Sequence, residues 1–141
     1  ARLDDLLRQP PRARCEGGRA HRSCADDALA ELSRVRRGAR RAQALGGVVG
    51  ASRVPCDLGW CSHAMQIGLT GKTVTPELYI AVGISGASHH LAGCGNAKTI
   101  VAINTDQDAA IFREAKFGVV GDYSKIVPAL TAAIEALPKL S

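Results

Sequence analysis

The chain has 141 residues, 46% of them hydrophobic, and a formal net charge of +5. This length allows one hydrophobic core and is too short for two ordinary domains, so we expect one core. A charged residue or a glycine-rich break interrupts every apolar run before it reaches the roughly 20 residues that a membrane-spanning helix needs, so the sequence predicts a soluble protein without a membrane span.

The positive charge is concentrated in the first third of the chain. Residues 1–53 contain twelve Arg, no Lys and six acidic residues, whereas residues 54–141 contain six basic and seven acidic residues. Residues 25–45 predict a helix, because Leu29, Leu32 and Val35 recur on one stripe. We therefore divide the chain into an Arg- and Ala-rich segment over residues 1–44, partly helical or disordered, and a packed domain over residues 45–141.

The basic tract over residues 34–41 leaves two interpretations open. Arginine-rich tracts can bind nucleic acid through the charge of the phosphates, so a basic nucleic-acid-binding protein acting through residues 1–53 is one alternative. The other is the solvated face of a helix. The tract comes with no zinc-finger spacing, aromatic stacking platform or groove-reading motif, which argues against nucleic acid as a partner.

The five cysteines are odd in number and lack the regular spacing of a small secreted scaffold, which favours a reducing compartment. Cys56, Cys61 and His63 form a cluster with one loose cysteine pair. Structural zinc sites usually combine two close pairs, so we predict no metal site.

From Gly46 onward, strand-like and helix-like segments alternate. Short apolar runs predict strands over residues 48–51, 78–83, 99–104 and 118–121. The segments between and after them predict helices over residues 86–92, 108–115 and 125–137. This alternation predicts an α/β fold with a parallel sheet and right-handed crossovers.

Polar residues follow each predicted strand. They are Ser52-Arg53, the loop Ile84 to His90, Asn104-Thr105-Asp106, and Asp122-Tyr123. Ligands of open parallel sheets bind beyond the carboxyl ends of the strands, so these residues are candidate ligand contacts. A helix that begins near Gly86 would direct its free N–H groups at a pyrophosphate. Asn104 and Asp122 suit hydrogen bonds to a nucleoside, although both are also common turn and cap residues.

The segment Gly68 to Thr73 has some likeness to a phosphate-binding loop. It is two residues shorter than the G-x-x-x-x-G-K-[ST] pattern, and it precedes a strand instead of following one. A nucleoside-triphosphate site of that type is therefore not expected.

Four segments together closely resemble one family. They are VGASR at residues 49–53, IGLTGKTVTPELYIAVGISGASHHLAG at residues 67–93, IVAIN at residues 100–104 and FGVVGD at residues 117–122. The order and spacing are those of the carboxyl-terminal FAD-binding domain of the electron transfer flavoprotein alpha subunit, from about Leu45 to Leu137. The resemblance implies a Rossmann-like parallel sheet with helices on both faces.

The resemblance also implies FAD as cofactor and assigns roles to individual residues. Ser52 would contact the FAD phosphates, Arg53 would lie against the flavin ring, and Thr70 would reach toward its N5 region. His90 would hydrogen-bond the pyrimidine side of the flavin. Asn104 and Asp122 would hold the adenosine portion. The full set of expected FAD contacts is Ser52, Arg53, Ile67, Gly68, Leu69, Thr70, Ser85, Gly86, Ala87, Ser88, His89, His90, Asn104, Asp122 and Tyr123, with no catalytic residue.

A protein of this family is an electron carrier and not an enzyme. The resemblance implies a heterodimer with a beta subunit, electrons taken from acyl-CoA or related flavin dehydrogenases, a downstream redox acceptor, and a location in the bacterial cytoplasm or the mitochondrial matrix. A flavin or nicotinamide oxidoreductase on a similar sheet is the alternative from the enzyme class.

The sequence departs from the family pattern at three places. Leu69 and His89 stand where many members have Gln, and losing an amide at position 69 predicts an altered flavin potential. Upstream, Gly17-Gly18-Arg19 is a poor match to the family's GGRG-like motif and lacks an apolar strand before it. We therefore expect the domain to lack its first strand, which would weaken independent retention of FAD.

Overall fold

The computed structural model describes residue 42 and residues 46–136. The chain forms two compact units, one ending at Gln66 and the other beginning at Ile67, and each is described by itself. Apart from the helical Ala42, the helix predicted over residues 25–45 lies outside the described residues, as do the Gly17-Gly18-Arg19 segment and most of the basic segment on which the nucleic-acid alternative depends.

The described part of the first unit consists of α3 (Arg53–Asp57), a short 3-10 helix (His63–Met65) and the connections around them. The strand predicted over residues 48–51 is wrong. Among the described residues, Ala51 alone of this run pairs, in a single parallel bridge with Gln66, and Val48 is 96% exposed. An apolar run becomes a strand only when a neighbouring strand completes its hydrogen bonds, and the described residues of this unit offer one bridge partner.

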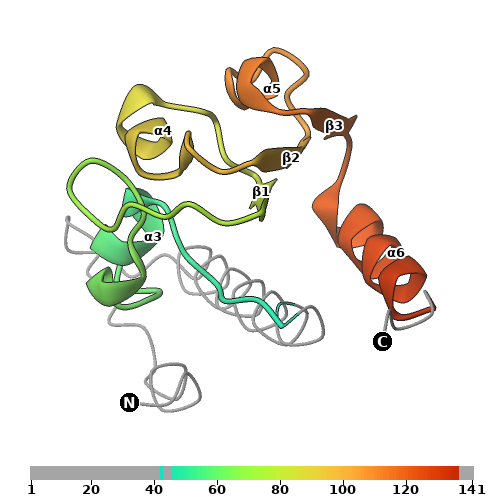
Figure 1. Ribbon diagram of the computed structural model, residues 1–141, viewed down its shortest axis with the longest axis horizontal. Helices are drawn as coiled ribbons and strands as arrows, with labels where there is room; N and C mark the ends of the chain where they lie inside the picture. Colours follow the sequence, from blue (N-terminus) through green and yellow to red (C-terminus); the bar gives the residue numbers. More distant parts are fainter. Residues whose placement is uncertain (1–41, 43–45, 137–141) are drawn as a thin grey trace, which may run out of the picture. The chain divides into compact units, whose positions relative to one another are not determined.

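The second unit is an α/β structure built on a three-stranded parallel sheet (Figure 1). Its elements are β1 (Leu78–Val82), α4 (Ser88–Cys94), β2 (Thr99–Asn104), α5 (Ile111–Glu114), β3 (Phe117–Val120) and α6 (Tyr123–Glu135). The strand order is β1-β2-β3, with Ala81 opposite Ala102 and Ala102 opposite Gly118. The sequence prediction of a parallel sheet is confirmed, with element boundaries shifted by up to three residues and Leu137 outside the described residues.

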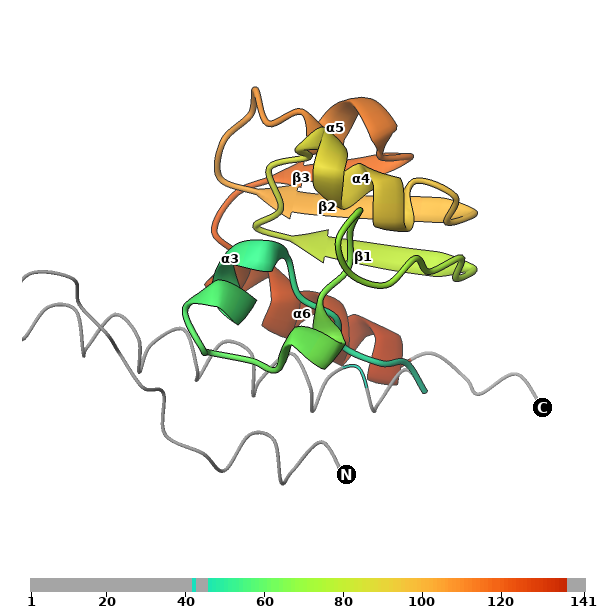
Figure 2. The same cartoon turned by 90° about the vertical axis from the view of Figure 1, so that its left-hand side faces the viewer.

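Helices cover both faces of this sheet. Figures 1 and 2 show α4 and α5 over one face and α6 on the other. The core lies under α4 and α5, where five buried residues pack together: Ala81, Ile100, Ala102, Ala109 and Ile111. Alanines at the centre of β1 and β2 let the short helices approach the sheet closely.

The face of the sheet that carries α6 keeps much of its apolar surface exposed. Leu78, Val82, Phe117 and Val119 alternate with the core residues and are 48%, 38%, 59% and 41% exposed, respectively. We call these four residues the open face. Among the described residues, no helix is long and apolar enough to cross a membrane.

Candidate functional site

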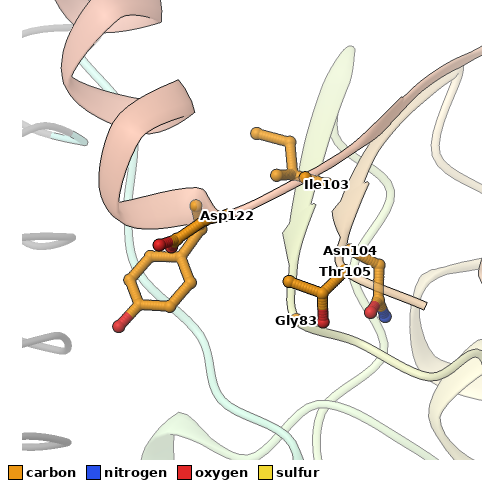
Figure 3. Close-up of a pocket in the computed structure, with 7 residues that line it drawn as sticks. Gly83, Ile103, Asn104, Thr105 and Asp122 are labelled. Atoms are coloured by element: carbon orange, nitrogen blue, oxygen red, sulfur yellow. The ribbon is translucent and has the colours of Figure 1, made fainter.

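A pocket of about 220 Å³ lies at the carboxyl ends of the three strands (Figure 3). Its lining comes from the end of β2, the turn after β1 and the connection from β3 to α6. The lining residues are Gly83, Ile103, Asn104, Thr105, Gly121, Asp122 and Tyr123. Parallel strands end at one edge of a sheet, so the topology itself brings the predicted Asn104, Asp122 and Tyr123 together.

The Asn104 amide is held in place from both sides. Its Nδ2 donates to the carbonyl oxygen of Ile84 at 3.0 Å, and its Oδ1 accepts from the backbone N–H of Asp106 at 3.0 Å. The first bond joins the end of β2 to the loop after β1, and the second forms the turn that follows β2. Asn104 therefore shapes the pocket wall as well as facing it.

Asp122 lies across the pocket from Asn104 and Thr105 (Figure 3). It is the N-cap of α6, where its Oδ1 accepts from the backbone N–H of Ser124 at 2.8 Å. This bond satisfies one of the unpaired N–H groups of the first helical turn and fixes the carboxylate at the pocket edge. The pocket thus combines an amide and a carboxylate, a pair suited to the hydroxyl and amino groups of a nucleoside.

A second group of predicted contacts lies in the turn between Ile67 and Lys72, which is docked on α4. The Leu69 N–H donates to the carbonyl oxygen of His89 at 2.7 Å, and the Gly68 N–H donates to the carbonyl oxygen of Lys72 at 3.2 Å. Gly68 is buried, whereas Leu69 and Thr70 are exposed. The fold therefore places Ile67 to Thr70 beside the start of α4.

Close packing of this turn depends on Gly93. A Cβ atom at position 93 would overlap the backbone of Gly68 and lie 2.9 Å from the carbonyl oxygen of Lys72. The Val74 N–H also donates to the Gly93 carbonyl at 2.7 Å. Gly93 belongs to the structural support of the candidate site, and the sequence prediction did not include it.

The loop from Ser85 to His90 is anchored at its start. The Ser85 carbonyl accepts from the Ile111 N–H at 3.0 Å, and Gly86 is buried against the backbone of Ala110 and Ile111. The predicted helix start near Gly86 is wrong by two residues, because α4 begins at Ser88 and Ala87 is its N-cap. Ala87, Ser88 and His89 are exposed.

His90 points into the unit and takes part in a buried hydrogen bond. Its side chain is 7% exposed, and its Nε2 lies 3.0 Å from the hydroxyl oxygen of Tyr79. Within the described residues its Nδ1 has no hydrogen-bond partner of good geometry. Burial lowers the pKa of His90, and the Ile67 backbone offsets part of that lowering. The ring is therefore neutral near pH 7 and acts as a hydrogen-bonding group instead of a positive charge.

Sequence analysis missed the residues that surround His90. Burial, and after it the thiol of Cys94, raises the pKa of Tyr79, so its phenol stays protonated. The Cys94 thiol also donates to the backbone carbonyl of His90 at 3.6 Å. Tyr79 and Cys94 lie on different elements, and their partnership depends on how α4 packs on β1, for which the sequence carries no local signal.

Ser52 and Arg53 belong to the unit that ends at Gln66. Ser52 is the N-cap of α3 by position, without a side-chain capping bond. The exposed Arg53 side chain donates through Nε to Asp57 Oδ2 at 3.0 Å, one helical turn away. Exposed pairs of this kind contribute little stability, about 0.3–0.5 kcal/mol, so the guanidinium can exchange Asp57 for another partner at small cost.

The Cys56, Cys61 and His63 cluster does not assemble a metal site. The described residues contain no group of three or more His, Cys, Asp or Glu side chains that could hold a metal ion. His63 instead places Nδ1 3.3 Å from Oε1 of Gln66.

Comparison with known proteins shows similarity to one family. Residues 27–95 match the model of the electron transfer flavoprotein FAD-binding domain. The electron transfer flavoprotein alpha subunit of Bacillus subtilis (strain 168) is 57% identical over 96 residues, which is 68% of this chain and 30% of the relative. The alpha subunit of Mycobacterium tuberculosis (strain H37Rv) is 56% identical over 95 residues, 67% of this chain and 30% of the relative.

The relatives include bacterial and mitochondrial proteins. The mitochondrial alpha subunit of Dictyostelium discoideum is 57% identical over 94 residues, 67% of this chain and 26% of the relative. The chain matches under a third of the length of these curated relatives.

Proposed function

We propose that this chain holds FAD and relays electrons between proteins without transforming a substrate of its own, because it belongs to the electron transfer flavoprotein alpha subunit family. The family domain it carries is the FAD-binding domain. When bound, FAD supplies the redox chemistry, and the residues of the chain bind and orient it.

The observation that carries the proposal is the pocket at the strand ends. A volume of about 220 Å³ is smaller than the roughly 300–1,000 Å³ of pockets that enclose a whole drug-sized ligand. It suits one portion of FAD. The amide of Asn104 and the carboxylate of Asp122 supply hydrogen-bonding groups for an adenosine, with Tyr123 and Thr105 completing the wall.

The flavin end of the cofactor is assigned to the turn and loop docked on each other beside α4. Leu69, Thr70 and His89 of this region are exposed, and Leu69 presents an apolar side chain that is 66% exposed. His90 is buried at the start of α4 and hydrogen-bonds Tyr79 as a neutral ring. The family resemblance assigns Ser52 to the FAD phosphates and Arg53 to the flavin ring.

The assembly and the redox partners belong to the same proposal. The alpha chain would pair with a beta subunit, accept electrons from acyl-CoA or related flavin dehydrogenases, and pass them to a downstream acceptor. Its place would be the bacterial cytoplasm or the mitochondrial matrix.

The direct test is a titration of the purified chain with FAD, with and without a co-expressed beta subunit, followed by gel filtration and a visible spectrum. Bound FAD should co-elute with the protein in at least the two-subunit preparation. Asn104→Ala should weaken FAD binding, whereas Lys98→Ala, which removes an exposed ion pair with Glu77, should not. Protein that is folded but free of flavin in both preparations would refute the proposal.

A further inference from the structure

Two thiols in the unit that ends at Gln66 lie unusually close together. The Sγ atoms of Cys56 and Cys61 are 3.4 Å apart, and both cysteines are free. Cys56 is only 2% exposed, whereas Cys61 is partly exposed. A disulfide has an S–S distance of about 2.05 Å, so an approach of about 1.3 Å would bring the two sulfur atoms to bonding distance.

The local fold produces this proximity. The α3 helix ends after Asp57, and the Gly59 N–H donates to the carbonyl oxygen of Cys56 at 3.0 Å. Gly59 has φ of +73°, a conformation that glycine adopts without strain, and it turns the chain back over the helix. The reversal carries Cys61 onto Cys56, and the Cys56 thiol also donates to the Ser62 carbonyl at 3.7 Å.

The pair also lies next to candidate FAD contacts. Cys56 and Arg53 are on the same five-residue helix, and Ser52 immediately precedes it. A bond between Cys56 and Cys61 would hold this helix to the turn that follows, and would restrict the segment that presents Arg53.

We propose that Cys56 and Cys61 form a reversible disulfide by exchange with a low-molecular-weight disulfide such as glutathione disulfide. The partly exposed Cys61 attacks one sulfur of glutathione disulfide, which releases one glutathione and leaves a mixed disulfide. Cys56 then attacks the Cys61 sulfur and releases the second glutathione. Two protein thiols are oxidised, one glutathione disulfide is reduced to two glutathiones, and the two thiol protons end on the released glutathiones.

The surroundings of the thiols set the speed of this exchange. Burial raises the pKa of both thiols. The pKa of Cys61 rises to about 12, with a further contribution from the neighbouring Cys56 thiol. The pKa of Cys56 is raised by burial and also by the charge of Asp57, while its hydrogen bond with Cys61 lowers it. Because the thiolate is the attacking form, the reduced pair reacts slowly near neutral pH. The pair therefore follows the thiol–disulfide balance of its surroundings over a long period instead of responding to brief oxidant pulses.

The test is equilibration of the full chain in glutathione buffers of graded oxidised-to-reduced ratio, then acid quenching, alkylation and peptide mapping by mass spectrometry. We expect a peptide in which Cys56 and Cys61 are joined, which carries no alkyl group and is two hydrogen atoms lighter than the unalkylated dithiol peptide. After return to reduced glutathione, both cysteines should be alkylated instead. Cys61→Ser and Cys56→Ser should each abolish it, and Cys94→Ser, in the other unit, should leave it unchanged. Cys61→Ser carries the test if Cys56→Ser fails to fold.

Two results would overturn the proposal: full alkylation of Cys56 and Cys61 after the most oxidising buffer, or cross-links only to Cys15 or Cys24.

The effect of the disulfide on FAD binding rests on the proposed function and has its own measurement. Oxidised and reduced chains in complex with the beta subunit should differ in FAD affinity. Equal affinities with the cross-link present would leave the disulfide established and remove its influence on the cofactor.

Discussion

His90 shows how one buried side chain makes stability depend on pH. Its pKa in the folded chain is lowered from the ordinary value of 6.5 by burial, so below about pH 6.5 the unfolded chain binds a proton that the folded chain does not. The free energy of unfolding should therefore be highest above pH 6.5 and fall as the pH drops below it, until the folded pKa is passed. Urea unfolding between pH 7.5 and 5.0 measures this.

The matched control for His90 is its exposed neighbour. His90→Gln should flatten the pH profile, because it removes the titrating group while keeping a partner for Tyr79, whereas His89→Gln should leave the slope unchanged. An unaltered slope in His90→Gln would contradict the assignment.

Asp122 has two roles that substitution can separate. Asp122→Ala should lower both stability, by about 1 kcal/mol through loss of the α6 cap, and FAD affinity. Asp122→Ser keeps a capping oxygen and removes the carboxylate, so it should retain the melting temperature and still weaken FAD binding. Thermal melts and FAD titrations of both variants provide the measurement. If Asp122→Ser binds FAD like the parent, the carboxylate serves the helix alone.

At the scale of elements, the most sensitive contact is the docking of the Gly68 turn on α4. Gly93→Ala should destabilise the chain by about 1–3 kcal/mol, because the added methyl overlaps backbone that has no side-chain rotamer to change. Ala92→Ser, on the exposed side of the same helix, should cost much less. Chemical denaturation distinguishes them, and equal stability of the two variants would show that the turn moves freely away from α4.

The strands β1, β2 and β3 could be predicted because each is a continuous apolar run of strand length. The same reasoning failed at residues 48–51, where Gln66 is the one bridge partner of an equally apolar run in the part of the chain that the structure describes. The pocket residues Asn104, Asp122 and Tyr123 could be predicted from their places after strands. Gly83, Ile103, Thr105 and Gly121 also line the pocket. Thr105 was among the polar residues expected after a strand, but none of the four was in the set of expected FAD contacts. The contacts of Gly93 and Tyr79 depend on packing between segments that are distant in the sequence, so no local sequence pattern predicted them.

At the scale of the whole molecule, the open face predicts how the chain behaves by itself. Its four apolar residues form a surface that a hydrophobic dye such as ANS should bind. Phe117→Asp should reduce ANS fluorescence, whereas Val48→Asp, at an exposed position outside the sheet, should reduce it less. Dye binding that is equal in both variants would place the exposed apolar surface elsewhere.

The hydrogen bonds that hold Asn104 and Asp122 also have a kinetic consequence. A nucleotide that arrives at the pocket meets side chains whose rotamers are already fixed by Ile84, Asp106 and Ser124, so little side-chain entropy is lost on association. Capture does not have to wait for the pocket to rearrange. In stopped-flow mixing, the observed rate of adenosine-end binding should therefore rise in proportion to FAD concentration, without the plateau that a slow opening step would impose.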